Sequence, residues 1–216
     1  MCCDIGRTYK LVVWCLLALA VPMVMFADTV RADEQSARAL VQSVTTEVLD
    51  TLRREGVDIR KDRARRVALM EQSVVPYFDF RLMAGQVLGR YWRSASDEQR
   101  KGFTEVFKQL LINTYAAVFE RYVDQTVEVL AAQSGGSPDR AVVPTNIKSS
   151  GEQDIRVNYR VYRSQGKWLV YDVVVDGISL LINYRSEYAN FLQQQSLDTL
   201  ITRLQEKNAA FVQAPN

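Results

Sequence analysis

The chain has 216 residues, a formal net charge of +2, no histidine and three cysteines, Cys2, Cys3 and Cys15. A near-neutral chain gives no argument for nucleic-acid binding, which usually requires a strongly basic face. Without histidine, and without cysteine beyond Cys15, the rest of the chain cannot form a Ser-His-Asp triad, a cysteine nucleophile, a disulfide or a zinc site with histidine or thiolate ligands.

Residues 1–32 have the pattern of an export signal. Two basic residues precede an uncharged apolar run over residues 11–26, and Ala32 is a small residue of the kind that a signal peptidase requires. The run is shorter than the roughly 18 apolar residues of a membrane span. The pattern therefore predicts export to a periplasm and cleavage near Ala32. It leaves a single domain over residues 33–207 and a flexible tail over 208–216.

The first predicted helix covers residues 35–55. Leu40, Val44 and Val48 repeat there at steps of four, which is the spacing of one helix face. Gly56 is expected to end the helix, because glycine is common just past the last helical residue.

The second predicted helix covers residues 60–74 and stops before Pro76, because the residue before a proline disfavours helical geometry. Its first turns carry five basic residues, which are Arg60, Lys61, Arg63, Arg65 and Arg66. Two interpretations stay open. The run is either a solvated helix face or a docking patch for an acidic partner or for anionic lipid headgroups.

A short helix and a long amphipathic helix are predicted next. The short one covers residues 77–88, and Gly89 closes it. Ser96 then has the features of an N-cap, with Gln99 three residues later as in a capping box. Apolar residues continue at steps of three and four from there to Tyr122, so one helix face is apolar throughout.

The period of the apolar residues changes to two after residue 125. The clearest strand covers residues 155–162, where apolar and polar side chains alternate. Alternating runs before it, and another run after the Gln165-Gly166 turn, predict four successive antiparallel strands over residues 125–176. Helical periods over residues 35–122 and 178–207 flank this sheet, and the fold class is therefore α+β.

The last predicted strand, which ends at Asp176, is apolar on both faces. Simple alternation predicts one face made of Leu169, Tyr171, Val173 and Val175. The other face is predicted to consist of Trp168, Val170 and Val174 together with the acids Asp172 and Asp176. A packed core and the wall of an apolar cavity would look alike at this level.

The acidic residues do not form a catalytic pair. Asp172 and Asp176 lie four residues apart in a strand, which separates them by about 13 Å. Glycosidase carboxyl groups lie roughly 5 to 9.5 Å apart. Turn or sheet-surface roles are expected for both acids instead. Asp79 shows no catalytic partner in the sequence, and Gly135-Gly136 lacks the lysine and Ser/Thr helix start of a phosphate-binding loop.

Several longer motifs occur in order between residues 37 and 207. Pro76–Phe80 (PYFDF), Val87–Gly89 (VLG) and Trp92–Arg100 (WRSASDEQR) are followed by VVPTNI, VNYRVYR, KWLVYDVVVDGISLLINYRSEYANFL and LDTLITRL. In these motifs the chain resembles the MlaC family of periplasmic phospholipid-binding proteins, also called the toluene-tolerance auxiliary proteins. Asp176 stands where the family usually has a glutamate, which is a mild departure.

The resemblance implies a twisted antiparallel sheet of about four strands, similar to the nuclear-transport-factor-like class and covered by a helical subdomain. Acyl chains would lie in an apolar cavity between sheet and helices, with the headgroup exposed. It implies a monomeric, non-enzymatic shuttle that has no cofactor or metal and carries a glycerophospholipid as cargo.

The implied partners are an inner-membrane ABC transporter complex with a ring-forming lipid-binding subunit and an outer-membrane lipoprotein–porin complex. Such a system maintains outer-membrane lipid asymmetry and organic solvent tolerance.

The period of the apolar residues, rather than a family motif, selects the candidates for the cavity wall. They are Val74, Val75, Tyr77, Met83, Val87, Leu88, Phe107, Leu111, Tyr115, Phe119, Ile155, Val157, Tyr159, Val173, Val175, Ile178 and Leu181. Two other functions stay open: a periplasmic adaptor of a transport complex that binds no lipid, and an exported enzyme of the same fold class.

Overall fold

The computed structural model describes residues 22–121, 125–149, 151 and 153–213, with side chains from Glu34 onward. Most of the predicted export signal therefore lies outside the described residues. From Pro22 the chain is helical through the predicted cleavage position near Ala32. None of the described helices combines the length and the apolar run that a membrane span requires.

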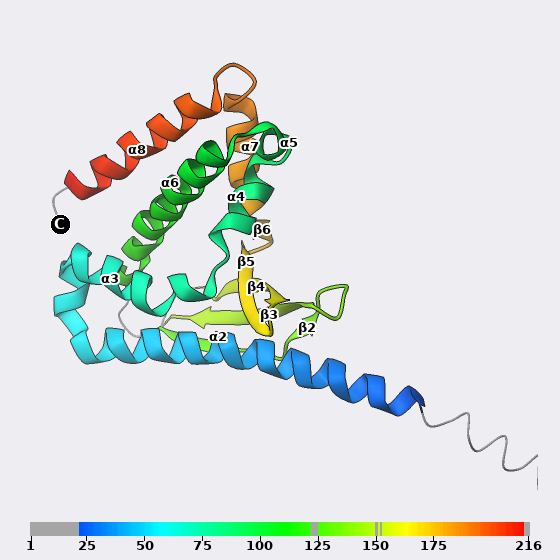
Figure 1. The fold of residues 1–216 in the computed structure, drawn as a ribbon. Coiled ribbons are helices and arrows are strands. Elements are labelled where there is room, and N and C mark those ends of the chain that lie inside the picture. Colours follow the sequence, from blue (N-terminus) through cyan, green and yellow to red (C-terminus); the bar gives the residue numbers. More distant parts are fainter. Residues whose placement is uncertain (1–21, 122–124, 150, 152, 214–216) are drawn as a thin grey trace, which may run out of the picture.

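The described residues place one sheet between two groups of helical segments in the chain (Figure 1). The segments before the sheet are α2 (Pro22–Lys61), α3 (Arg63–Ser73), the 3-10 helix η1 (Val75–Tyr77), α4 (Phe80–Leu88), α5 (Arg90–Ser94), α6 (Asp97–Ala116) and the 3-10 helix η2 (Ala117–Arg121). The strands are β1 (Thr126–Val129), β2 (Gln133–Ser134), β3 (Arg140–Lys148), β4 (Ile155–Ser164), β5 (Lys167–Val175) and β6 (Ile178–Ser179). The segments after the sheet are α7 (Leu180–Phe191) and α8 (Leu197–Gln213).

The strands form one antiparallel sheet in the order β1–β3–β4–β5–β6, and β2 pairs with the free end of β3. This confirms the predicted α+β class. The described part of the sheet has six strands, however, where about four were expected. The additional strands, β2 and β6, are only two residues long, which is too short for alternation to be visible in the sequence.

A β-bulge changes the faces of β5. Tyr159 pairs with Val173 and Val161 pairs with Val170, and the register shifts between Arg160 and Val161. Directly paired residues of an antiparallel ladder lie on the same face, so Val170 and Val173 share a face although they are three residues apart. The prediction that they face opposite ways is wrong, because one extra residue in β5 reverses the alternation.

Two helix boundaries depend on local chemistry. The capping box is confirmed: the Ser96 hydroxyl accepts from the Gln99 backbone at 3.2 Å, and the Gln99 side chain accepts from the Ser96 backbone at 3.0 Å. Gly56, with φ of 57°, interrupts the helical geometry within α2, and the helix resumes to Lys61. Glycine adopts this φ at little cost, so Gly56 kinks the helix where the sequence predicted its end.

The long central helix is shorter than predicted. α6 ends at Ala116 and is followed by the tighter turns of η2, which ends at Arg121. Tyr122, the predicted last residue of this helix, lies outside the described residues.

Three groups of buried apolar side chains hold the fold together. The helical core joins α4, α6, α7 and α8, which form the upper layer of Figure 1. The sheet core packs Ala37 and Val41 of α2 against β1, β3, β4 and β5. α2 correspondingly runs beneath the sheet in Figure 1. The corner core joins the later part of α2 to α3 through Val48, Leu52, Ile59 and Leu69. The fold is thus built on three separate cores.

α8 extends six residues past its predicted end. Asn208 is buried, and its side-chain amide donates to the Val106 carbonyl oxygen at 2.9 Å. Its own side-chain oxygen accepts from Asn113 at 3.2 Å. These bonds hold the last turns of α8 against α6 to Gln213, within the region predicted as a flexible tail. Residues 214–216 lie outside the described residues.

Candidate functional site

Several apolar side chains that pack against the three cores are only partly buried. We call this set the seam; its members are Val74, Phe78, Tyr115, Phe119, Tyr159 and Val173. Phe78 packs against both the helical core and the sheet core, and Val74, four residues earlier, packs against the corner core. The segment 74–78 therefore runs from one core to the junction of the other two.

Backbone pairing fixes the position of this segment against the sheet. Phe78 forms an isolated parallel bridge with Val170 of β5, and the Asp79 backbone donates to the Val170 carbonyl oxygen at 3.0 Å. The Asp79 carboxylate caps α4 by accepting from the Leu82 backbone, and it also accepts from the Tyr162 hydroxyl. Asp79 thus links α4 to the sheet, a structural role that its neighbours in the sequence did not reveal.

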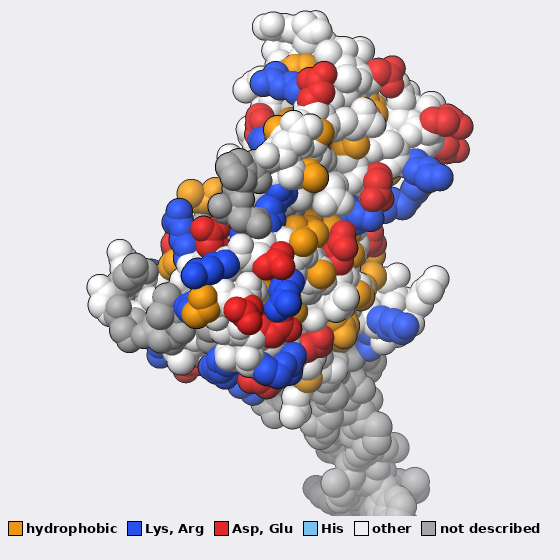
Figure 2. All heavy atoms as spheres, turned by 90° about the vertical axis from the view of Figure 1, so that its left-hand side faces the viewer, with side chains coloured by type: hydrophobic (Ala, Val, Ile, Leu, Met, Phe, Trp, Pro, Cys, Tyr) orange, Lys and Arg blue, Asp and Glu red, His pale blue; other side chains and the backbone are white. Residues whose placement is uncertain are grey.

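The apolar face of the sheet continues beyond the seam to an exposed end. Val157 pairs with Val175, and Val175 pairs with Ile178 across the next strand. Val157 is buried, whereas Ile155 is 41% exposed, Val175 39% and Ile178 68%. On the face shown in Figure 2, hydrophobic side chains gather where the upper and lower parts of the molecule meet. Large apolar side chains that are exposed next to one another indicate a surface that binds a ligand or a partner.

The candidate wall residues fall into three places. The first group is fully packed within the helical core and consists of Met83, Val87, Leu88, Phe107, Leu111 and Leu181. The second group is partly buried in or beside the seam and consists of Val74, Val75, Tyr77, Tyr115, Phe119, Tyr159 and Val173. The third group, Ile155, Val157, Val175 and Ile178, forms the end of the sheet. Phe78 belongs with the second group but was not among the candidates, although its place in the PYFDF motif was a usable signal.

The tyrosines of the seam are neutral hydrogen-bonding groups at physiological pH. Burial raises the pKa of Tyr159 above its ordinary value. Burial also raises the pKa of Tyr115, and a hydrogen bond with Tyr184 partly offsets that rise. Both phenols therefore stay uncharged within largely apolar surroundings.

The two acids of the last strand have different roles. Asp172 is buried and accepts from Arg160 at 2.9 Å, from the Ser179 hydroxyl at 2.7 Å and from the Leu181 backbone at 3.2 Å. The expected turn or surface role is therefore wrong for Asp172, which joins β5 to α7 in the interior. Asp176 lies in the β5–β6 turn with φ of 47° and accepts from the Arg156 backbone, as a turn residue would.

The basic run is not uniformly solvated. Arg65 is paired with Asp62, and Arg63 donates to Asn113 of α6 at 3.1 Å. Arg66 is buried, while Lys61 is exposed. Among the five basic candidates, Arg63 and Arg66 thus point into the fold and serve the interior.

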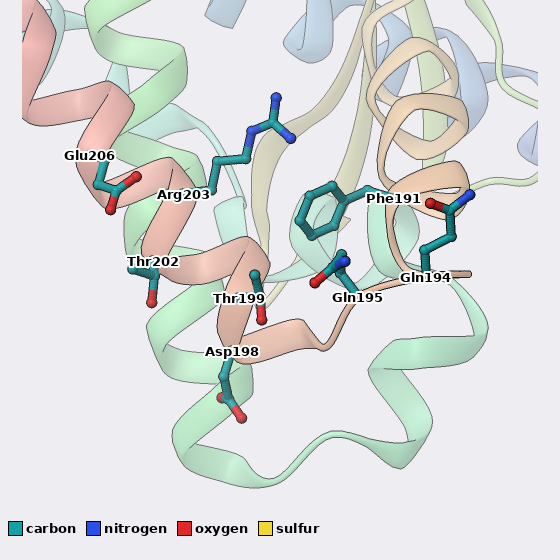
Figure 3. A pocket seen from close by; sticks show the side chains of 8 residues that line it. All are labelled: Phe191, Gln194, Gln195, Asp198, Thr199, Thr202, Arg203 and Glu206. Atoms are coloured by element: carbon teal, nitrogen blue, oxygen red, sulfur yellow. The ribbon is translucent and has the colours of Figure 1, made fainter.

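Two pockets lie away from the seam. One of about 840 Å³ lies between α7 and α8 and is lined largely by polar side chains, and the Arg203 guanidinium lies over the Phe191 ring, 5.3 Å from its centroid (Figure 3). The other, of about 260 Å³, lies beside Glu34 and the β2–β3 loop. Neither is lined by a candidate wall residue. The described residues also contain no group of three or more acidic, histidine or cysteine side chains able to hold a metal ion.

Comparison with known proteins places this architecture in context. The model of the MlaC protein family matches residues 42–206. The intermembrane phospholipid transport system binding protein MlaC of Haemophilus influenzae is 25% identical over 206 residues, which cover 94% of each chain. A toluene tolerance protein of Pseudomonas putida is 25% identical over 165 residues, which cover 76% of each chain.

A solved structure is also similar. It is the phospholipid-binding protein from Ralstonia solanacearum in complex with a phospholipid, which superimposes with a TM-score of 0.74 at 29% sequence identity. The match covers 82% of this chain and 99% of the Ralstonia chain. The likeness therefore extends over the whole of that protein, including both sheet and helices.

Proposed function

Because the chain belongs to the MlaC family, we propose that it binds a glycerophospholipid in the periplasm and carries it between membranes. The observation that carries the proposal is the seam of partly buried apolar side chains around the three cores, together with the exposed sheet end at Val175 and Ile178. The similarity to a phospholipid-bound protein over its full length supports the same conclusion.

The acyl chains would lie along the seam, over the sheet face that carries Tyr159 and Val173. Burying a methylene releases about 0.8 kcal/mol, so two chains of about 15 methylenes release a gross figure near 25 kcal/mol. Ordering of the chains and of the protein offsets part of this gain. A cargo held so strongly leaves slowly unless a partner binds an opened state more tightly than the closed one.

The partners that would supply this opening are an inner-membrane ABC transporter complex with a ring-forming lipid-binding subunit and an outer-membrane lipoprotein–porin complex. Shuttling between the two would maintain the lipid asymmetry of the outer membrane. The protein would then act by binding and release alone, with no chemical step.

Native mass spectrometry tests the proposal directly. The full chain is produced in a Gram-negative periplasm, and the purified protein is weighed and its lipid extracted and identified. A mass excess equal to one or two phospholipids is expected. A bare polypeptide mass, with no lipid taken up from phosphatidylethanolamine and phosphatidylglycerol vesicles, would contradict it and favour an adaptor.

A disulfide tests the opening step. The chain has no cysteine after Cys15, so the double variant Phe78→Cys, Val170→Cys forms a single bond between the bridge partners of η1–α4 and β5. The oxidised protein is expected to retain its lipid when mixed with acceptor vesicles and the partner complexes, and dithiothreitol should restore transfer. Equal transfer with and without the bond would show that this junction does not open.

A further inference from the structure

Arg66 of α3 is a buried cation whose hydrogen-bonding capacity is only partly used. Arg66 is only 5% exposed to solvent. Nη1 donates to the Arg60 carbonyl oxygen, and Nη2 lies 3.5 Å from the Glu120 carboxylate. Nε is buried and has no hydrogen-bond partner among the described residues. A buried unpaired donor on a charged group is costly, so this arrangement calls for a further acceptor.

The unused hydrogen-bonding edge of the Arg66 guanidinium has a defined geometry. Nε–H and one N–H of Nη2 share an edge of the planar guanidinium, and that edge binds two oxygens of one carboxylate or phosphate side by side. Glu120 contacts only the Nη2 end of the edge, at the limit of a hydrogen bond, and its side chain is 61% exposed. Glu120 therefore covers the edge from the solvent side without satisfying it.

Arg66 lies beside the corner core, which follows one turn further along α3 at Leu69. In the chain around it the basic residues Arg60, Lys61, Arg63 and Arg65 outnumber the one acid, Asp62, which pairs with Arg65. Phe119, the residue before Glu120, is a member of the seam and packs against that core. An anion on the Arg66 edge would thus lie next to an apolar surface proposed for acyl chains.

We propose that the Nε/Nη2 edge of Arg66 is a subsite for one phosphate group, which binds as the Glu120 carboxylate swings into solvent. The site takes a phosphate oxyanion in a bidentate geometry. Its source as the phosphate of a lipid headgroup rests on the proposed function, whereas binding of free phosphate does not.

The test compares three variants of the mature protein with the wild type. Arg66→Lys keeps the positive charge but loses the bidentate edge. Glu120→Gln removes the competing carboxylate. Arg65→Gln is the matched control, because it removes one exposed charge from the same helix and leaves Arg66 intact. Melting curves first establish that each variant is folded.

Two probes separate the sources of the phosphate. The first is inorganic phosphate, titrated against the change in melting temperature at constant ionic strength. The second is retention of dioleoylphosphatidylglycerol, compared with dioleoylglycerol, which has the same chains and no phosphate, after loading from vesicles. Loss of one charge-assisted bidentate contact is expected to weaken binding about tenfold.

If the phosphate belongs to a lipid headgroup, Arg66→Lys should lower the retention of phosphatidylglycerol about tenfold and Glu120→Gln should raise it. Retention of dioleoylglycerol should be the same in all variants, and Arg65→Gln should retain phosphatidylglycerol like the wild type. If the site binds free phosphate, inorganic phosphate should raise the melting temperature of the wild type. Arg66→Lys should abolish that rise and Glu120→Gln should increase it, while lipid retention stays equal in all variants. Either pattern supports the subsite. No response of either probe to Arg66→Lys and Glu120→Gln would overturn it. A wild type that binds no lipid but does bind phosphate through Arg66 would refute the proposed function alone.

Discussion

The carboxylate of Asp172 accepts a hydrogen bond of 2.7 Å from the hydroxyl of Ser179, and that same hydroxyl caps the first turn of α7. Asp172 also accepts from the Leu181 backbone within this turn. One buried carboxylate in β5 therefore anchors the start of α7 on the sheet. Since α7 contributes Leu181, Tyr184 and Tyr188 to the helical core, this bond helps to set the position of the helical layer over the seam.

Replacing Asp172 with alanine is expected to lower the free energy of unfolding by about 3 kcal/mol, because the Ser179 hydroxyl and the Leu181 backbone lose their acceptor and Arg160 loses its partner. Urea denaturation measures the change. Asp139→Ala is the control, since the Asp139–Arg163 pair lies at 3.5 Å on the surface and should contribute little. Equal losses in both variants would contradict the anchoring role.

The contact between α8 and α6 depends on Asn208. Asn208→Ala should destabilise the protein by about 2 kcal/mol, because the Val106 carbonyl oxygen and the Asn113 amide would be left buried without their partner. Urea denaturation and amide hydrogen exchange over residues 205–213 measure the effect. Asn190→Ala, at an exposed position of α7, is the matched control and should behave like the wild type.

Replacing Tyr188 should stabilise the protein and should also change how its stability depends on pH. Its hydroxyl is buried with no hydrogen-bond partner among the described residues, so Tyr188→Phe should raise the free energy of unfolding by about 1 kcal/mol at pH 8. Burial, followed by the nearby Glu187 charge, raises the pKa of this phenol well above its ordinary value of 10.0.

The unfolded chain therefore ionises near pH 10 while the folded phenol stays protonated, and stability falls as pH rises above 10 by up to about 1.4 kcal/mol per pH unit for each such tyrosine. Tyr188→Phe should reduce that slope by one tyrosine's share. Urea denaturation at pH 8, 10 and 11 measures it, and an unchanged slope would refute the assignment.

A charge introduced at the exposed end of the sheet should lower lipid loading but leave folding unchanged. Val175 is 39% exposed, so Val175→Glu is tolerated by the fold, but it places a carboxylate beside the proposed path of the acyl chains. Loading from vesicles, followed by lipid extraction, should fall about tenfold at a similar melting temperature. Val212→Glu, at a position 75% exposed near the end of α8, is the control. Equal loading in both variants would exclude this end of the sheet.

Local chemistry made several elements predictable from the sequence. Ser96 and Gln99 form the expected capping box because both partners lie within one turn. The alternation in residues 155–162 predicts β4, since one face of that strand is packed and the other is polar. The motifs from Pro76 onward identify the family, whose model matches residues 42–206.

Contacts between distant parts of the chain decided the rest. The apolar period selected Met83 and Tyr159 alike as wall candidates, yet Met83 is sealed in the helical core and Tyr159 lies in the seam. Periodicity reports that a side chain is turned inward, but not which surface it meets. For the same reason the burial of Asp172 and Asn208 was not visible.

The sequence by itself thus determined the α+β class, the start of α6, the strand β4 and the family, because capping, alternation and motif order act over a few residues. Only the tertiary structure decided which face of β5 Val170 occupies, which side chains stay partly buried around the three cores and that Arg66 is buried beside Glu120. These features arise from a one-residue bulge and from contacts between segments some fifty or more residues apart, which no local pattern encodes.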